Sequence, residues 1–237
     1  VTYLGPTGSH IGHKESIRDT ARVLGRLYDA IEYRGFRQQD VEELARCAGV
    51  PVYNGLTDQS HPTQILADMM TMREYTHKHL SDIVIVFMGD IRNNVARTLA
   101  LGAARVGMHL RLCGPASLTP DAEYISHLAG INAQSGGSLM ITDNPHSGVD
   151  EVDFVYTDVW LSMGEDEALW AERIKLLKPY QVNADLMRHT GNRHTKFMHC
   201  LPAFHDTETE VGRQVEKALG ITAMEVTNEV FERFLVS

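Results

Sequence analysis

The stretch IVIVFMGDIRNN, residues 83–94, decides the fold class of this chain, because it joins a continuous apolar run to a polar cluster. Residues 83–88 are all apolar and rich in β-branched side chains, which is typical of a strand buried on both faces of a parallel sheet. The cluster that follows, with Asp90, Asn93 and Asn94, lies where the strand would end and a helix would begin. In open α/β sheets, ligands bind beyond the carboxyl ends of the strands, so this cluster is a candidate binding site.

Two further strand patterns end in chemically useful residues. Residues 154–157 (FVYT) precede Asp158 and the sequence SMG at 162–164, and residues 197–199 (FMH) precede Cys200. Because the carboxyl ends of parallel strands meet at one edge of a sheet, we expect these two clusters and the first one to converge on a single crevice.

A fourth cluster, HPTQ at residues 61–64, opens a helical pattern at 62–75 and could face the same crevice. Unpaired N–H groups and the helix dipole at such a position favour an anion or a polarised carbonyl group. A histidine there tends to stay neutral and to donate a hydrogen bond. His61 and Gln64 therefore suit the binding of a polar substrate, and the alternative is that both only cap the helix.

Arg34 ends the strand pattern at residues 30–34, after an apolar run. A guanidinium group at the carboxyl end of a strand suits a phosphate group or a carbonyl oxygen. The alternative is a surface ion pair, for example with Glu32.

Asp158 and the SMG sequence at 162–164 together suit the α-carbon of an amino acid. The carboxylate of Asp158 could hold an ammonium group, and backbone N–H groups of the SMG loop could hold a carboxylate. The alternative is an ordinary cap of the helix expected at 167–177. Asn94 could likewise bind a carboxylate or, with Asn93, cap the next helix.

The three cysteines, Cys47, Cys113 and Cys200, are widely spaced and odd in number, which suits a reducing cytosol better than a disulfide framework. Cys200 lies at a strand end beside a histidine, where it could have thiolate character, although most cysteines are small buried apolar groups. The bond between Leu201 and Pro202 is a candidate cis peptide.

Strand and helix patterns alternate along most of the chain, which predicts βαβ units. The expected fold is α/β, with two lobes that are each a parallel sheet flanked by helices and with the active site in the cleft between them. We expect the domains to cover residues 1–77 and 78–237. Strand patterns lie at 1–4, 30–34, 50–53, 83–88, 110–113, 139–142, 154–157, 197–199 and 224–226, and helical patterns at 17–28, 40–48, 62–75, 95–106, 122–129, 167–177 and 209–219.

Composition narrows the class of partner. The chain has 237 residues, a hydrophobic content of 43% and a net charge of −9 at pH 7. This charge argues against a nucleic-acid or anionic-membrane partner, but a local Arg/His cluster could still bind a small anion. No apolar run approaches the roughly 18 residues that span a bilayer, and no signal peptide is recognisable. We therefore expect a cytoplasmic protein.

Metal and dinucleotide binding are poorly supported. The pairs His10/His13 and His199/His205 have residue types that bind metals, but neither belongs to a complete ligand set at the usual spacing. The Gly89 turn lacks the glycine spacing of a dinucleotide site. We expect neither a metal nor a cofactor.

Together, the motifs of the chain resemble those of the aspartate/ornithine carbamoyltransferase family, and the resemblance covers almost the whole chain. The SMG sequence is typical of members that use ornithine rather than aspartate or putrescine. The motifs that carry the resemblance are GHKES at 12–16, YRG at 33–35, HPTQ at 61–64, GD at 89–90 with NN at 93–94, TDVWLSMG at 157–164 and HCLP at 199–202.

The resemblance implies an activity: the δ-amine of L-ornithine attacks the carbamoyl carbon of carbamoyl phosphate, and citrulline and phosphate form. It implies that Arg34, His61 and Cys200 are catalytic, with Arg34 and His61 on the carbonyl oxygen, and that no metal, cofactor or covalent intermediate takes part. The implied carbamoyl-phosphate-binding residues are His10, Arg34, His61, Gln64, Cys200 and Leu201, and the implied ornithine-binding residues are Asn94, Asp158, Ser162 and Met163.

The resemblance also implies a homo-oligomer, a trimer or a multiple of trimers, in which the loop at residues 10–16 reaches a neighbouring subunit's site. The family's phosphate-binding sequence Ser-x-Arg-Thr-Arg would precede Val1, and neither it nor the family's Glu-Asn-Arg-Met-His sequence occurs in these 237 residues. His10 stands where a glutamine is usual. A chain without the phosphate-binding sequence is expected to bind carbamoyl phosphate poorly. The alternatives are a carbamoyltransferase for another amine and a catalytically incomplete fragment or paralogue.

Overall fold

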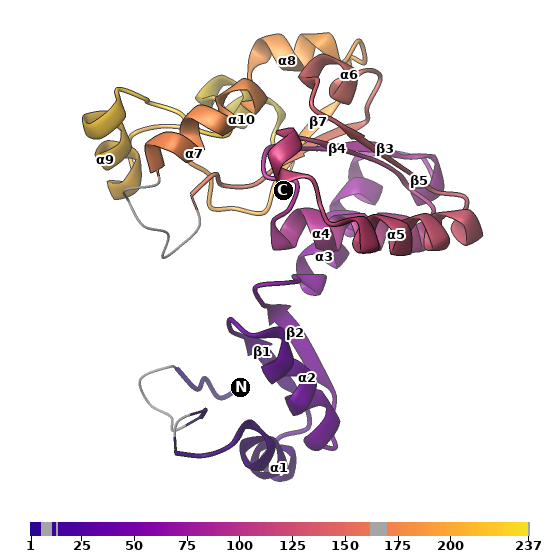
Figure 1. The fold of residues 1–237 in the computed structure, drawn as a ribbon, viewed down its shortest axis with the longest axis vertical. Coiled ribbons are helices and arrows are strands. Elements are labelled where there is room, and N and C mark those ends of the chain that lie inside the picture. The colour runs from indigo at the N-terminus through magenta and orange to yellow at the C-terminus, as the bar shows by residue number, and fades with distance from the viewer. Residues whose placement is uncertain (6–10, 13, 162–169, 237) are drawn as a thin grey trace. The chain divides into compact units, whose positions relative to one another are not determined.

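The computed structural model describes residues 1–5, 11–12, 14–161 and 170–236 (Figure 1). By its internal contacts, the chain divides into two compact units, Val1–Thr63 and Gln64–Ser237. Both units contain parallel strands and helices, so the predicted α/β class is confirmed.

The first unit contains a small sheet of two parallel strands, β1 (Ile31–Arg34) and β2 (Val52–Leu56). Helix α2 (Gln38–Cys47) connects the strands, and α1 (Ile17–Leu27) packs against α2. The two helices come very close at Gly25, where a Cβ atom would overlap the carbonyl oxygen of Ala48. Only glycine fits this crossing.

The strand expected at residues 1–4 is wrong, because these residues have no strand hydrogen bonding and Tyr3 is exposed. The apolar side chains suggested a strand, but the sheet of this unit consists of β1 and β2 in the described residues.

Helix α3 (Pro62–Tyr75) has the bounds that the sequence predicts. The division of the chain falls within its first turn, so most of the helix belongs to the second unit. There, Ile65, Asp68 and Met72 are buried, which places an acidic side chain in an otherwise apolar interior.

The second unit is built on a five-stranded parallel sheet with the order β5-β4-β3-β6-β7. The chain builds the sheet outward from β3 through β4 to β5, and then continues on the other side of β3 with β6 and β7. The strand order therefore reverses between β3 and β6, and such a switch point is the usual ligand site of an open α/β sheet. The strands are β3 (Val84–Met88), β4 (His109–Cys113), β5 (Ser138–Thr142), β6 (Phe154–Thr157) and β7 (Lys196–His199).

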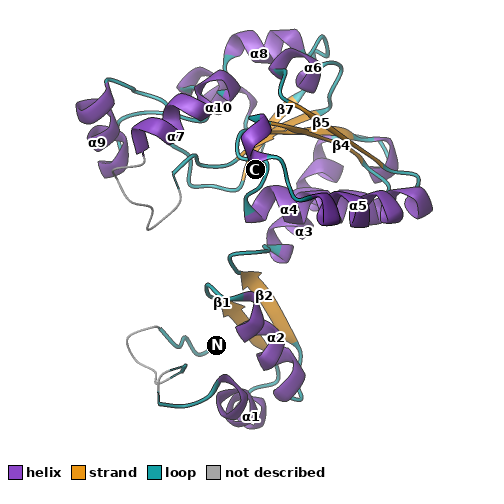
Figure 2. Ribbon diagram, viewed as in Figure 1, coloured by secondary structure: helices purple, strands orange, loops and turns teal. Residues whose placement is uncertain are grey.

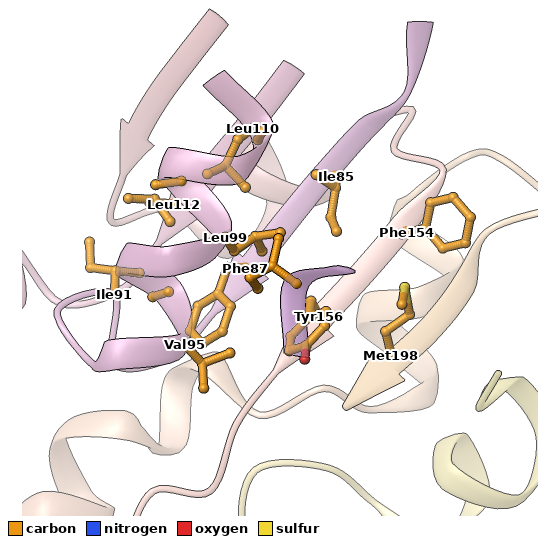
Figure 3. Close-up of a cluster of buried hydrophobic side chains, with 14 of the residues drawn as sticks. Ile85, Phe87, Ile91, Val95, Leu99, Leu110, Leu112, Phe154, Tyr156 and Met198 are labelled. Carbon is orange, nitrogen blue, oxygen red and sulfur yellow. The ribbon is translucent and has the colours of Figure 1, made fainter. Parts of the chain in front are cut away.

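Alternate residues of β3 point to opposite faces of the sheet, and each set enters a different core. Ile85 and Phe87 lie in the larger apolar cluster (Figure 3), and Val86 and Met88 lie in the smaller one. Figure 2 shows α4 (Asn94–Val106) and α5 (Ala122–Ser135) on one side of the sheet and α6 (Pro145–Val149) and α8 (Ala184–His189) on the other. The larger cluster includes side chains of α3, α4, α5, α7 (Trp170–Leu177) and α9 (Glu210–Leu219), and the smaller one includes side chains of α6, α8 and α10 (Asn228–Phe234).

Several expectations differ from the structure. The expected strand at 224–226 is a single bridge between Val182 and Val226, because the chain turns into α10 directly after it. Helix α5 continues to Ser135, six residues beyond the predicted end, because Gly130 is tolerated inside it. Helices α6, α8 and α10 were not predicted, since five to seven residues are too few to form a recognisable apolar stripe.

The register of the sheet aligns three strand ends. Met88 pairs with Thr157, and Thr157 pairs with His199, so the residues after β3, β6 and β7 emerge side by side. Among the described helices, none is both long and apolar enough to cross a membrane.

Candidate active site

Asp158, the residue after β6, joins the three aligned strand ends through its carboxylate. Its Oδ1 accepts hydrogen bonds from the Cys200 thiol at 2.9 Å and from the Val159 N–H at 2.7 Å. Its Oδ2 accepts one from the Asn93 side-chain amide at 2.9 Å. Polar residues after β3, β6 and β7 therefore meet at the switch point, as the sequence predicts.

Burial controls the charge of this cluster. It raises the pKa of the Asp158 carboxyl, although the hydrogen bond from Cys200 and the nearby His199 oppose the rise. Burial also raises the pKa of the Cys200 thiol far above its ordinary value, and the neighbouring Asp158 carboxylate raises it further. Cys200 is therefore a neutral thiol that donates to Asp158, and the interpretation of Cys200 as a thiolate is wrong.

Asn93 serves both as a helix cap and as a partner of the cluster. Its Oδ1 accepts a hydrogen bond from the Ala96 N–H at 2.7 Å, which caps α4, while its amide nitrogen binds Asp158. Asn94 is the first residue of α4, and its carbonyl oxygen accepts a hydrogen bond from the Thr98 hydroxyl. The capping interpretation is therefore correct for Asn93, and ornithine binding by Asn94 stays a prediction.

Leu201 follows Cys200 in an uncommon conformation. Its φ of 51° is left-handed, and the Leu201–Pro202 peptide, a candidate cis bond in the sequence, is cis. The Leu201 N–H donates a hydrogen bond of 2.8 Å to Nδ1 of His199. The backbone at this strand end is thus fixed by a side chain of the strand itself.

In the first unit, Arg34 is exposed at the end of β1, and His61 lies directly before α3. Partial burial and the positive charge of Arg34 lower the pKa of His61. A neutral imidazole at pH 7 is consistent with a hydrogen-bond donor to a carbonyl oxygen.

Gln64 does not cap α3 but binds a buried carboxyl group one turn further on. Its side-chain amide donates a hydrogen bond of 2.9 Å to Oδ1 of Asp68. Burial raises the pKa of Asp68 to about 6. Three other predicted residues, His10, Ser162 and Met163, lie outside the described residues.

Family models match both parts of the chain. One, described as "Aspartate/ornithine carbamoyltransferase, carbamoyl-P binding domain", matches residues 1–74, and another, described as "Aspartate/ornithine carbamoyltransferase, Asp/Orn binding domain", matches residues 81–234. The chain belongs to the aspartate/ornithine carbamoyltransferase family. The resemblance found in the sequence motifs is thereby confirmed.

Relatives within this carbamoyltransferase family are similar over nearly the whole chain. The catabolic ornithine carbamoyltransferase of Rhizobium meliloti (strain 1021) is 59% identical over 233 residues, which are 98% of this chain and 70% of the relative. That of Pseudomonas putida is 56% identical over 234 residues, with the same two shares. The solved structure of ornithine carbamoyltransferase from Pyrococcus furiosus has a TM-score of 0.85 at 38% identity and covers 98% of this chain and 67% of its own.

Two charged residues of this carbamoyltransferase fold were missed in the sequence. Arg173 of α7 pairs with Asp90 at 2.6 Å and donates to the carbonyl oxygen of Trp160, so it ties the segments after β3 and β6 together. Glu225 lies fully buried opposite His199. An acid inside the apolar run at 224–226 was the available signal for Glu225, whereas Arg173 resembles any charged residue on a helix.

One group of possible metal ligands occurs among the described residues of this carbamoyltransferase. His146, Asp185 and His189 are exposed on α6 and α8, and their nearest ligand atoms lie within 4.8 Å of one another. The two imidazole rings stack on each other, and the carboxylate of Asp185 is already paired with Arg188. These three residues lie on α6 and α8, whereas the residues at the switch point follow β3, β6 and β7.

Proposed function

We propose that this protein is an ornithine carbamoyltransferase, which transfers the carbamoyl group of carbamoyl phosphate to the δ-amine of L-ornithine and releases citrulline and phosphate. The observation that carries the proposal is the cluster of Asp158, Cys200 and Asn93 at the switch point of a chain that both family models match. The names of the relatives point to the same reaction.

On the ornithine side, Asp158 binds the α-ammonium group, and Asn94, Ser162 and Met163 contact the rest of the amino acid. An ammonium ion beside Asp158 favours the ionised carboxylate, which offsets the effect of burial on its pKa. The aligned ends of β3 and β6 support this role, because they bring Asp158 and the start of α4 to one edge of the sheet.

On the carbamoyl phosphate side, Arg34 and His61 donate hydrogen bonds to the carbonyl oxygen, and His10 and Gln64 complete the binding of this substrate. Cys200 and Leu201 lie beside the carbamoyl group and the reacting amine. A neutral His61, favoured by the charge of Arg34, supports its role as a donor rather than a proton source.

In the reaction, the lone pair of the δ-amine forms the new C–N bond, the carbon–oxygen bond to phosphate breaks, and the proton that the amine loses passes to the departing phosphate. Hydrogen bonds from Arg34 and His61 stabilise the negative charge that develops on the carbonyl oxygen. Most of the remaining acceleration comes from holding the two substrates in the reactive geometry.

The test is citrulline formation from carbamoyl phosphate and ornithine by the purified protein, with putrescine and N-acetylornithine as alternative amines. We expect product from ornithine alone, with a high KM for carbamoyl phosphate in these 237 residues because they lack the phosphate-binding sequence. The rate should rise with pH because the attacking amine must be unprotonated. Product from another amine would support carbamoyl transfer but contradict ornithine as the substrate. No product with any of the three amines, or a flat rate between about pH 6 and 9, would contradict the proposal.

We further propose a domain boundary between residues 77 and 78, a cytoplasmic location and a trimer or a multiple of trimers. The boundary is supported by the gap between the two family matches, at residues 75–80. Assembly is supported by Leu66 and Met70, which lie one turn apart on α3 and are 64% and 65% exposed, as apolar side chains at a subunit contact would be in an isolated chain.

The names of the two curated relatives contain the word "catabolic", which supports a place in arginine breakdown, in the arginine deiminase pathway. Steady-state kinetics of the reverse reaction, carbamoyl phosphate formation from citrulline and phosphate, test this place: a reverse kcat comparable with the forward kcat supports it, and a reverse kcat far below the forward one contradicts it.

A further inference from the structure

A basic and an acidic side chain, His199 and Glu225, are fully buried next to the Cys200–Leu201 segment. His199 of β7 and Glu225 are both 0% exposed, and Nε2 of His199 lies 3.4 Å from Oε1 of Glu225. We propose that His199 and Glu225 are positioning residues for carbamoyl transfer, because together they hold the backbone of Leu201 and, with it, Cys200. This inference rests on the proposed function of Cys200 and Leu201.

A hydrogen bond to one ring nitrogen of His199 fixes the roles of both. The N–H of Leu201 donates to Nδ1 of His199 at 2.8 Å, so Nδ1 is an acceptor and a neutral ring carries its proton on Nε2. Nε2 is the nitrogen that faces Glu225. The carboxylate therefore favours the tautomer that accepts from Leu201, in the way that a second group often orients a functional histidine.

The conformation of Leu201 requires such support. A leucine with a φ of 51° is in the left-handed region, which disfavours side chains with a Cβ atom. Residues held in this region are concentrated at functional sites, where the surroundings impose the conformation. In this chain, the hydrogen bond from the Leu201 N–H to His199 is a contact that supports it.

Glu225 also fixes the far end of the same turn. Its Oε1 accepts a hydrogen bond of 2.6 Å from the N–H of Phe204, and the adjacent Met224 N–H donates to the Phe204 carbonyl oxygen at 2.8 Å. Glu225 itself is anchored, because its carbonyl oxygen accepts a hydrogen bond from the N–H of Val182. The buried carboxylate of Glu225 thus contacts both ends of the turn from residue 199 to 204: it faces His199 and accepts from Phe204.

Burying a carboxylate and a polar ring costs free energy that apolar side chains would not, so a purely structural role explains the pair poorly. Apolar residues could fill this interior as they fill the rest of the cluster around Met198 and Met224. The polar pair is explained if the acceptor for Leu201 and the donor for Glu225 are needed.

Two substitutions at His199 separate the two ring nitrogens. In His199→Asn, the amide oxygen can replace Nδ1 and keep the bond to Leu201, whereas in His199→Gln the amide nitrogen can replace Nε2 and keep only the contact with Glu225. We expect His199→Gln to lower kcat by about 10- to 100-fold relative to His199→Asn, since small misplacements at a reacting centre have effects of this size. Equal losses in the two variants would overturn the proposal.

A second readout does not depend on which amine is the substrate. Alkylation of Cys200 by iodoacetamide, followed on the Cys200 peptide by mass spectrometry, should be slow in the wild-type protein and in His199→Asn but faster in His199→Gln. If the wild-type protein forms no citrulline, the proposed function fails while this difference still tests the positioning role. The pair His109→Asn and His109→Gln, on β4 and outside the site, is the matched control and should show no difference.

Two further measurements cover the case in which neither His199 variant folds. Glu225→Gln keeps an oxygen for the Phe204 N–H but removes the charge that faces His199, so kcat should fall and Cys200 should react faster. In the unaltered protein, the N–H of Leu201 should exchange slowly with deuterium although its side chain is 45% exposed. Unchanged behaviour of Glu225→Gln, or exchange of the Leu201 N–H at the rate of an unprotected amide, would overturn the proposal.

Discussion

The carboxylate of Asp158 has about four lone-pair positions, and groups of the protein fill three of them. Cys200 and Val159 both donate to Oδ1, while Asn93 is the one described donor to Oδ2. With respect to the donors of the described residues, one position on Oδ2 remains, and it suits one N–H of the ammonium group that the proposed function places there.

Asp158→Asn should therefore impair the use of ornithine. The substitution removes the charge that faces the ammonium group and places a second amide donor beside Asn93 and Cys200. Loss of a charge-assisted hydrogen bond corresponds to a decrease in kcat/KM for ornithine of roughly 10- to 100-fold. Steady-state kinetics with each substrate varied would measure the decrease. Asp185→Asn, an exposed control on α8, should change nothing, and an unchanged kcat/KM for ornithine in Asp158→Asn would contradict the assigned role.

Asp68 makes the stability of the protein depend on pH. Its pKa in the folded protein is raised from 3.8 to about 6, so the stability that its protonated form contributes is fully present below pH 3.8 and is lost as the pH rises to about 6. The full loss is about 3 kcal/mol of unfolding free energy.

Asp68→Asn should remove this dependence, because the amide keeps an acceptor for Gln64 but cannot ionise. Relative to the wild type, the variant should gain about 2 kcal/mol between pH 4.5 and 7.5 in urea unfolding. Asp150→Asn, at an exposed aspartate, is the control. A constant difference between Asp68→Asn and the wild type at all pH values would refute the expectation.

At the residue scale, the sequence identifies side chains that directly follow strands, but it does not identify the residues with which those side chains form hydrogen bonds or ion pairs. Asp158 and Cys200 were recognisable because each comes directly after a buried run. The bond from Asn93 to Asp158 spans 65 residues, and the pair of Arg173 with Asp90 spans 83. Such contacts depend on which strands are neighbours, and a local pattern does not contain that information.

At the element scale, the long helices and central strands could be predicted, since their patterns are strong. The bounds of α3 and β6 match the prediction, and β3 differs by one residue. The remaining errors concern short helices and isolated apolar stretches, where tertiary contacts outweigh local preference.

Two glycines inside helices should respond in opposite ways to alanine. At Gly130 of α5, a Cβ atom would meet nothing within 4 Å, so Gly130→Ala should stabilise the protein by about 0.5–1 kcal/mol. At Gly102 of α4, a Cβ atom would lie 2.6 Å from Ile65 and 3.0 Å from Met69, so Gly102→Ala should destabilise it by about 1–3 kcal/mol. Thermal unfolding of the pair measures both, and shifts of the same sign would contradict the packing of α3 on α4.

At the scale of the whole molecule, the strand order explains why the cluster forms at all. Residues after β3 and β6 become neighbours only because the chain reverses its direction of sheet building between them. The sequence predicted parallel strands and convergence of their ends, but the order β5-β4-β3-β6-β7 was not among its predictions. Long-range packing decides which strands pair, and the alternation of strands and helices along the sequence does not determine that order.

The proposed trimer predicts a solution mass of three times 26.5 kDa, or a multiple of that mass. Light scattering after size-exclusion chromatography measures it. Replacing Leu66 and Met70 together by lysine should lower the mass to that of single chains, because two charges would then lie in the contact. Val23→Lys, another exposed apolar position, is the comparison. A wild-type protein with the mass of one chain would contradict the assembly.

The reversal between β3 and β6 also separates fold from choice of substrate. Strands β3 to β5 come from one continuous stretch of chain and β6 to β7 from another, and the seam between them is where Asp158 begins the next segment. Trp160 and Leu161 after Asp158 are buried in the larger apolar cluster, so the chain beyond this seam is anchored in the same core as the strands. If the proposed function holds, the choice of amine depends on a few side chains at the seam, Asp158 among them, and changing them leaves the five strands as inherited.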